Sequence, residues 1–209
     1  MPLKVFVTPV TPFEQNSSVL VCERTGLAAV IDPGGDLDRI RGVLAKAGAR
    51  LEKILLTHAH IDHAGATAVL AREEGVPIEG PHQGDAFWIE RLPEQSRMFS
   101  FAEAETFTPD RWLENGDSVT VGECPLEVYH CPGHTPGHVV FFSREQRFAI
   151  VGDVLFAGSI GRTDLPGGNH QELLDSINEI LEGTGAVAHF DVKMDQAGSQ
   201  QKFSLLKRR

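Results

Sequence analysis

The stretch THAHIDH, residues 57–63, places three of the chain's nine histidines and one aspartate in a single short run. It follows directly after the apolar residues Ile54-Leu55-Leu56, a run that is typical of a buried β-strand. Polar side chains crowded beside a hydrophobic strand are costly to bury unless something cationic pairs with them. The stretch therefore predicts a metal site at the end of a strand, with the candidate ligands His58, His60, Asp62 and His63.

Two later segments repeat the pattern of an apolar strand that runs into a loop with histidine or aspartate. They are LEVYHCPGHTPGH, residues 126–138, and FAIVGDVLF, residues 148–156. Loops that follow strands in α/β architectures converge at one edge of the sheet, so we expect His134 and Asp153 to join the first cluster. Gly133 and Gly152, which precede them, would let the backbone come close to a metal. Three other histidines are expected to be ordinary core or surface residues: His82, His130 and His170.

The order of the expected elements indicates one domain of α/β type over residues 1–209. Helices are expected at residues 37–47, 65–75 and 171–181, and residues 93–100 are expected to form a loop. Short strands are expected at residues 5–10, 18–23, 27–31, 51–56, 118–121, 126–130, 138–142 and 147–153, with a last candidate at residues 185–190.

Composition excludes several classes of protein. The formal charge of -10, from 19 basic and 29 acidic residues, repels nucleic acid. Three cysteines without C-x-x-C spacing argue against a disulfide framework and against a thiolate metal site. The N-terminus lacks the pattern of a signal peptide, and no run approaches the ~18 apolar residues of a membrane span. We expect a cytoplasmic protein that binds neither nucleic acid nor membranes and has no obligatory protein partner.

The combination of H-x-H-x-D-H, a later P-G-H-T and a G-D after a strand resembles the metallo-β-lactamase fold superfamily. The resemblance runs from about Val5 to Leu181 and implies an α/β fold, a four-layered αβ/βα sandwich with metals at one edge. It also implies that one metal is held by His58, His60 and His134 and a second by Asp62 and His63, with Asp153 bridging. These ligands suit two divalent metal ions, with zinc expected and iron or manganese as alternatives.

Within the superfamily the chain is most similar to the small single-domain hydroxyacylglutathione hydrolases of glyoxalase II type. The similarity lies in IDPGG at 31–35, THAHIDHAG at 57–65, CPGHTPGH at 131–138 and VGDVLFAGSIGRTDLPGGN at 151–169. The implied activity is hydrolysis of a small-molecule, glutathione-derived thioester by a metal-bound hydroxide. The GRTD stretch also resembles persulfide dioxygenases, whose single iron would sit on His58, His134 and Asp153. A β-lactamase is disfavoured because nothing here resembles the longer chains of those enzymes.

Four further residues receive expected roles. Asp62 is expected to be catalytic, because it could orient the attacking hydroxide as well as bind metal. Thr57 and His138 are candidates for hydrogen bonds that fix imidazole tautomers. Arg162 would either bind a glutathione carboxylate or form an internal pair with Asp164 that rigidifies its loop.

The C-terminal segment, from about residue 186, departs from the pattern of these hydrolases and is atypical. Similar hydrolases end their last strand with Gly-His-Gly-Pro, whose histidine completes the second metal site, and this motif is missing here. Either His189 substitutes after a local shift, or the second site is incomplete and the protein is mononuclear or weakly active, or the terminal segment has been altered. A metal-binding protein that retains the fold without turnover is a further alternative. The larger relatives also carry an extra helical domain that helps to bind glutathione. That domain is not expected in this chain, so other thioesters are alternative substrates.

Overall fold

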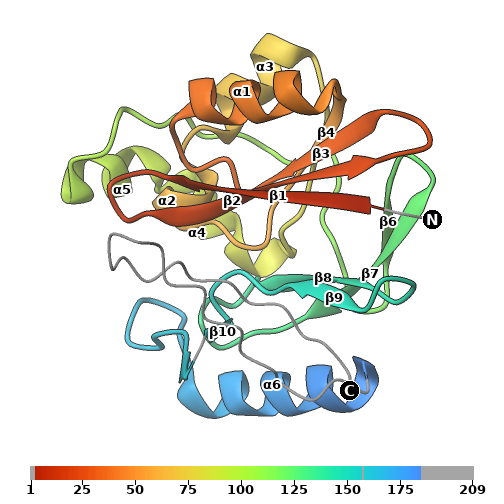
Figure 1. Ribbon diagram of the computed structural model, residues 1–209. Helices are drawn as coiled ribbons and strands as arrows, with labels where there is room; N and C mark the ends of the chain where they lie inside the picture. Colours follow the sequence, from red (N-terminus) through yellow and green to blue (C-terminus); the bar gives the residue numbers. More distant parts are fainter. Residues whose placement is uncertain (1–2, 157, 185–209) are drawn as a thin grey trace.

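The strands of this protein form two main sheets that face each other, with helices on both outer sides (Figure 1). The structure is a computed structural model that describes residues 3–156 and 158–184. Each sheet therefore has one face on its partner sheet and one face under helices, so both faces must be apolar. The four layers confirm the predicted αβ/βα sandwich.

The first sheet has the strand order β1-β2-β3-β4-β5. Strands β1 to β3 pair antiparallel, whereas β3, β4 and β5 are parallel and need helical crossovers between them. The bounds of the strands are β1 Leu3–Val10, β2 Gln15–Cys22, β3 Leu27–Ile31, β4 Arg50–Leu55 and β5 Ile78–Glu79. The crossover helices are α1 Leu37–Ala47, α2 Ile61–Ala64 and α3 Thr67–Glu74.

Helix α1 has the bounds that the sequence predicts. Ile40 and Leu44, one turn apart, are buried against the first sheet. Gly48 ends the helix in the left-handed conformation, with φ 61°. The second predicted helix corresponds to α3, and the short helix α2 precedes it, separated from it by Gly65 and Ala66.

The second sheet has the order β6-β7-β8-β9 and is antiparallel throughout. Its strands are β6 Ser118–Val121, β7 Cys124–His130, β8 Val139–Ser143 and β9 Phe148–Ile150. A small hairpin follows, formed by β10 Leu155–Phe156 and β11 Ser159–Ile160. Helix α6, His170–Thr184, lies along the outer side of this sheet (Figure 1).

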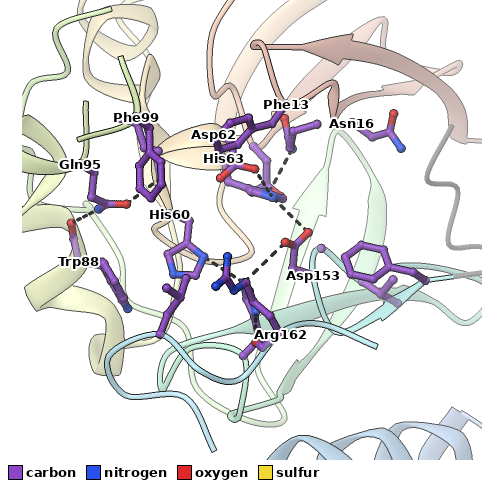
Figure 2. Close-up of a pocket in the computed structure, with 18 of the residues that line it drawn as sticks. Phe13, Asn16, His60, Asp62, His63, Trp88, Gln95, Phe99, Asp153 and Arg162 are labelled. Atoms are coloured by element: carbon purple, nitrogen blue, oxygen red, sulfur yellow. Dashed lines mark hydrogen bonds and ion pairs between the residues drawn. The ribbon is translucent and has the colours of Figure 1, made fainter. Parts of the chain in front are cut away.

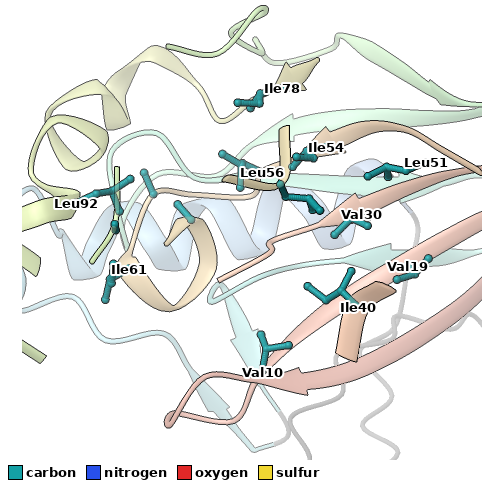
Figure 3. Close-up of a cluster of buried hydrophobic side chains, with 14 of the residues drawn as sticks. Val10, Val19, Val30, Ile40, Leu51, Ile54, Leu56, Ile61, Ile78 and Leu92 are labelled. Carbon is teal, nitrogen blue, oxygen red and sulfur yellow. The ribbon is translucent and has the colours of Figure 1, made fainter. Parts of the chain in front are cut away.

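Three apolar clusters separate the layers. The first lies between the first sheet and its helices and includes Val30, Ile40 and Ile54 (Figure 3). The second lies between the sheets and includes the next residues along the same strands, Ile31 and Leu55. Alternate residues of a strand thus fill opposite layers. The third lies between the second sheet and α6 and includes Val140, Phe142, Leu173 and Ile180.

The prediction of a loop at residues 93–100 is wrong, because α5 spans Leu92–Phe99. It follows the short 3₁₀ helix Gln83–Asp85 and helix α4, Ala86–Glu90. Pro93 lies in the first turn of α5, where proline is compatible with a helix. The buried Gln95 accepts a hydrogen bond from the Ile61 N–H and donates one to the Trp88 carbonyl. A contact with a segment distant in the sequence, at Ile61, therefore stabilises this helix.

The C-terminal strand candidate, His189 and the atypical segment from about residue 186 lie outside the described residues, so their prediction stays a prediction. The three cysteines, Cys22, Cys124 and Cys131, are buried free thiols, as expected. Within residues 3–156 and 158–184, no helix combines the length and apolar character that a membrane crossing requires.

Candidate metal centre

The six predicted ligands meet at one end of the two sheets. His58 and His60 follow β4, and Asp62 and His63 lie in the first turn of α2. His134 lies between β7 and β8, and Asp153 follows β9. Figure 2 shows His60, Asp62, His63 and Asp153 around the same space. Strand ends from both sheets thus supply one cluster.

The cluster contains two groups whose ligand atoms lie within 4.8 Å of one another. One is His58, His60 and His134, the set implied for the first metal. The other is His58, His63 and Asp153. A carboxylate oxygen of Asp153 lies 3.3 Å from His63 Nε2, and the other lies 3.6 Å from His134 Nε2, so this side chain reaches both groups.

Asp62 belongs to neither group, although its Oδ2 atom lies 3.7 Å from His63 Nε2. The resemblance implied that Asp62 pairs with His63, but the Asp62 carboxylate lies farther from His63 Nε2 than the Asp153 carboxylate does, at 3.3 Å. Asp62 instead opens onto the cavity beside the cluster.

Hydrogen bonds decide which nitrogen of two histidines is available to a metal. His63 Nδ1 lies 3.0 Å from the Asp32 carboxylate, and His134 Nδ1 lies 2.7 Å from the Arg162 carbonyl oxygen. Both partners only accept hydrogen bonds, so each Nδ1 donates its proton. The Nε2 atoms of His63 and His134 therefore point toward the cluster.

The cluster also holds buried nitrogens that lack hydrogen-bond partners among the described residues. They are the Nε2 atoms of His58 and His60. Such groups are costly to bury unless a ligand satisfies them. His60 Nδ1 and His134 Nε2 lie 2.9 Å apart, so they face the same point. Imidazole nitrogens with a nearby carboxylate, as found here, fit divalent metal ions.

Burial also keeps most of the imidazoles neutral, which is the form that binds metal. Desolvation, together with the neighbouring histidines, lowers the pKa of His58 and of His60 well below the usual value. Burial likewise lowers the pKa of His134. His63 differs, because the carboxylates of Asp62 and Asp153 outweigh burial and raise its pKa in the metal-free protein.

Asp32 organises the histidine loop and was not among the predicted site residues. Its carboxylate accepts hydrogen bonds from the Thr57 N–H at 2.7 Å and from the Thr57 hydroxyl at 2.6 Å, besides the one from His63. The residue is buried and has φ 54°, a left-handed conformation that is uncommon for aspartate. Its place in the IDPGG motif, directly after a strand, was the available signal.

Asp85 is the second residue that the sequence did not reveal. Its carboxylate accepts hydrogen bonds from the N–H of Ala59, the hydroxyl of Thr135 and the N–H of Gly137. It therefore ties the loop after β4 to the loop after β7. Burial outweighs these bonds and raises its pKa to about 6. Nothing in the surrounding sequence, PHQGDAFW, indicates this role.

Thr57 and His138, the two residues expected to support the ligands, both contact the cluster. The Thr57 hydroxyl lies 3.1 Å from His58 Nδ1, and the buried His138 ring stacks on His58 with centroids 4.7 Å apart. His138 Nε2 accepts a hydrogen bond from the Asp153 N–H. His138 thus connects ligands that come from different sheets, whereas Thr57 contacts His58.

The two glycines singled out in the sequence serve different purposes. A Cβ atom on Gly152 would lie 2.6 Å from both His138 Nε2 and Thr57 Oγ1, so this glycine does allow a close approach at the cluster. A Cβ atom on Gly133 would instead meet the backbone of Leu173 in α6. Gly133 therefore accommodates a helix, and its expected role at the metal stays a prediction.

Arg162 contributes to the site through its backbone. Its carbonyl oxygen orients His134, whereas its guanidinium makes a bidentate pair with Asp164, with both distances 2.7 Å. The internal pair is thus formed. The side chain still lines the cavity, so the expected contact with a substrate carboxylate stays a prediction.

A cavity of about 410 Å³ opens beside the cluster. Its lining includes His60, Asp62, His63, His134 and Asp153 on one side. Apolar residues from the β1–β2 turn, α5 and the GRTD loop form much of the remainder, including Phe13, Met98, Phe99 and Leu165. The space is large enough for a small molecule to lie against the candidate ligands.

The model of the metallo-beta-lactamase superfamily matches residues 10–184, which include both sheets' candidate ligands. The chain belongs to the metallo-beta-lactamase superfamily. This assignment confirms the resemblance seen in the H-x-H-x-D-H motif, and the superfamily fold together with the histidine cluster indicates a site for divalent metal.

Among relatives in this superfamily, the chain is similar to the hydroxyacylglutathione hydrolase GloC of Haemophilus influenzae. The two are 42% identical over 180 residues, which cover 86% of this chain and 84% of the relative.

Two solved metallo-beta-lactamase folds are also similar. TTHA1623 in a di-iron-bound form has a TM-score of 0.76 and 33% identity, and the match covers 85% of this chain and 86% of that one. The BLEG-1 B3 metallo-beta-lactamase has a TM-score of 0.79 and 34% identity, with 88% of each chain covered. Chain length is therefore no argument against a β-lactamase, and that part of the sequence argument was wrong.

Proposed function

We propose that this protein is a metal-dependent hydrolase that cleaves thioesters of the S-lactoylglutathione type. The observation that carries the proposal is the pair of adjoining ligand groups on the wall of a cavity, with Asp153 in reach of both. The 42% identity to a hydroxyacylglutathione hydrolase supports the thioester as substrate. The hydrolytic class has wider support, because the chain is similar to the BLEG-1 metallo-beta-lactamase as well.

In this proposal His58, His60 and His134 would hold one metal, Asp62 and His63 would hold the second, and Asp153 would serve both. Bound divalent cations would supply a nucleophile at neutral pH by lowering the pKa of water, and would polarise the substrate carbonyl. Zinc is the proposed metal, with iron or manganese as alternatives, and the similarity to a di-iron protein supports keeping iron among them.

The protein's own groups would position the reaction. Asp62 has a partly exposed carboxylate that faces the cavity, so it can accept a hydrogen bond from the attacking water and orient it. Asp32, through His63, and the Arg162 carbonyl, through His134, hold the imidazoles in one tautomer. Arg162 could exchange Asp164 for a carboxylate of the glutathione moiety.

The experiment is hydrolysis of S-lactoylglutathione by protein reconstituted with zinc, iron or manganese, with metal content measured in parallel. We expect about two metals per chain and turnover that requires them. His58→Ala should abolish turnover, because His58 belongs to both ligand groups. His170→Ala, at an exposed position outside both groups, is the matched control.

Other outcomes would replace the proposal. Oxygen consumption with a persulfide and a single iron would make the protein a dioxygenase. Turnover of a β-lactam in preference to the thioester would make it a lactamase. One metal or none, with no turnover, would leave a metal-binding protein with an incomplete second site.

A further inference from the structure

We propose that the acyl group of the substrate is apolar and binds against a wall formed by Phe13, Met98 and Phe99. We call this surface the aromatic wall, after its two phenylalanines. This inference rests on the proposed thioesterase function and specifies which thioesters the site accepts. It starts from the distribution of exposed apolar side chains.

The exposed large hydrophobic residues of the described chain are these three, with exposed fractions of 50%, 65% and 40%. All three line the cavity that also contains the candidate metal ligands. Figure 2 shows Phe13 and Phe99 on the side of this cavity opposite Arg162. Exposed apolar side chains gathered at a cavity indicate a binding surface.

The wall is assembled from two distant segments. Phe13 lies at the tip of the β1–β2 hairpin, and Met98 and Phe99 lie in the last turn of α5. The Phe13 ring makes edge contacts with Phe99 and Phe101, at centroid distances of 5.8 Å and 5.0 Å. Such contacts hold the rings in place at little further entropic cost when a ligand binds.

The local backbone keeps Phe13 in this position. The Phe13 N–H donates to the Thr11 hydroxyl, and the Thr11 N–H donates to the Asp36 carboxylate at 2.8 Å. Thr11 has φ 67°, an unfavourable conformation for a β-branched residue. On the other side, Gln95 links α5 directly to the histidine loop at Ile61. The wall therefore has a defined place relative to the metal centre.

The charged groups of the cavity do not offer an equivalent polar binding surface. Arg91 makes a bidentate pair with Glu94, at 2.8 Å and 3.0 Å, and Arg162 is similarly engaged by Asp164. Both arginines that line the cavity are thus paired, and in the proposed function Arg162 exchanges its partner for a glutathione carboxylate, so neither arginine is left for the acyl group. A small polar acyl group such as lactoyl would leave the aromatic wall in water. An alkyl or aromatic acyl group would cover it.

The test uses the full-length, metal-loaded protein and two thioethers that cannot be hydrolysed, S-methylglutathione and S-hexylglutathione. Calorimetry should show the hexyl compound binding at least about tenfold more tightly, since added methylenes are worth about tenfold or more in an apolar pocket. Phe13→Ser and Met98→Ser should remove most of this difference and leave the affinity for the methyl compound unchanged. Phe99→Leu, which keeps an apolar side chain, should preserve it.

A matching activity series compares S-lactoylglutathione with S-hexanoylglutathione. We expect kcat/KM to favour the hexanoyl ester in the wild type and to lose that preference in Phe13→Ser. Equal binding of the two thioethers, no binding of either, or variants that weaken both equally would overturn the inference. Absence of thioester hydrolysis, with the preference for the hexyl thioether intact, would overturn only the proposed reaction.

Discussion

The Asp32 carboxylate lies 3.0 Å from Nδ1 of His63 and also accepts both hydrogen bonds that Thr57 offers. One buried residue after β3 thus orients two parts of the histidine loop after β4. Because β3 and β4 are parallel neighbours, their ends meet at the same sheet edge. The precision of the candidate metal centre therefore depends on a residue that binds no metal itself.

Replacing Asp32 should weaken metal binding without removing a ligand. For Asp32→Ala we expect a loss of about 10–100-fold in metal affinity, the range found when groups that orient metal-bound histidines are removed. Competition with a chromophoric chelator measures this. Asp38→Ala, at a fully exposed position in α1, is the matched control. Unchanged affinity in Asp32→Ala would show that the tautomer of His63 is held by other groups.

Asp85→Asn should lower the free energy of unfolding. An amide presents one oxygen, so it cannot accept at both positions where the Asp85 carboxylate receives hydrogen bonds from Ala59, Thr135 and Gly137. A buried donor left unsatisfied costs about 1–3 kcal/mol, which urea denaturation would resolve. Glu90→Gln, at an exposed position in α4, should have no such effect.

Gly152→Ala should damage the centre more than Gly158→Ala. Both glycines have positive φ, 48° and 72°, so both substitutions carry backbone strain of about 1 kcal/mol or more. The new Cβ clashes at Gly152, with His138 and Thr57, whereas a Cβ on Gly158 would have no atom of the described residues within 4 Å apart from its chain neighbours. Metal content and thermal unfolding should both fall in Gly152→Ala, whereas Gly158→Ala should retain its metal. Equal losses would refute the steric explanation.

The metal-free protein should become less stable as the pH falls from 7 to 5. Burial lowers the pKa of His58, His60, His134 and His138, so the folded state leaves these imidazoles neutral. The unfolded chain protonates them below a pKa of about 6.5, and each such group destabilises the fold by up to about 1.4 kcal/mol per pH unit below that value.

Other groups modify this trend but do not reverse it. His63 has a raised pKa, so it is protonated in both states below about pH 6.5 and adds no slope there. Asp85, with a pKa raised to about 6, binds a proton in the folded state and offsets one histidine, and the raised pKa of Asp62 acts in the same direction. Urea denaturation at several pH values measures the net slope. Stability that rises between pH 7 and pH 5 would contradict the assignment of neutral histidines.

Much of this architecture follows from local patterns. The periodicity of Ile40 and Leu44 and the stop at Gly48 located α1 at its observed bounds. The runs at residues 118–121 and 126–130 located strands of the second sheet. The dense motif at residues 57–63 and its two partner loops located the candidate metal centre. The reason is that loops after strands converge at one edge of a sheet, where their side chains can form one site.

Other features depend on contacts between distant segments, and only the tertiary structure revealed them. Helix α5 forms at residues expected to be a loop because Gln95 is buried against Ile61. Asp85 matters because folding brings it between two loops, and nothing in its own neighbours reveals this. Residue types and spacings thus determined the chemistry of this protein, whereas the support of the ligands and the aromatic wall at Phe13 and Phe99 arose only from packing, which no local pattern encodes.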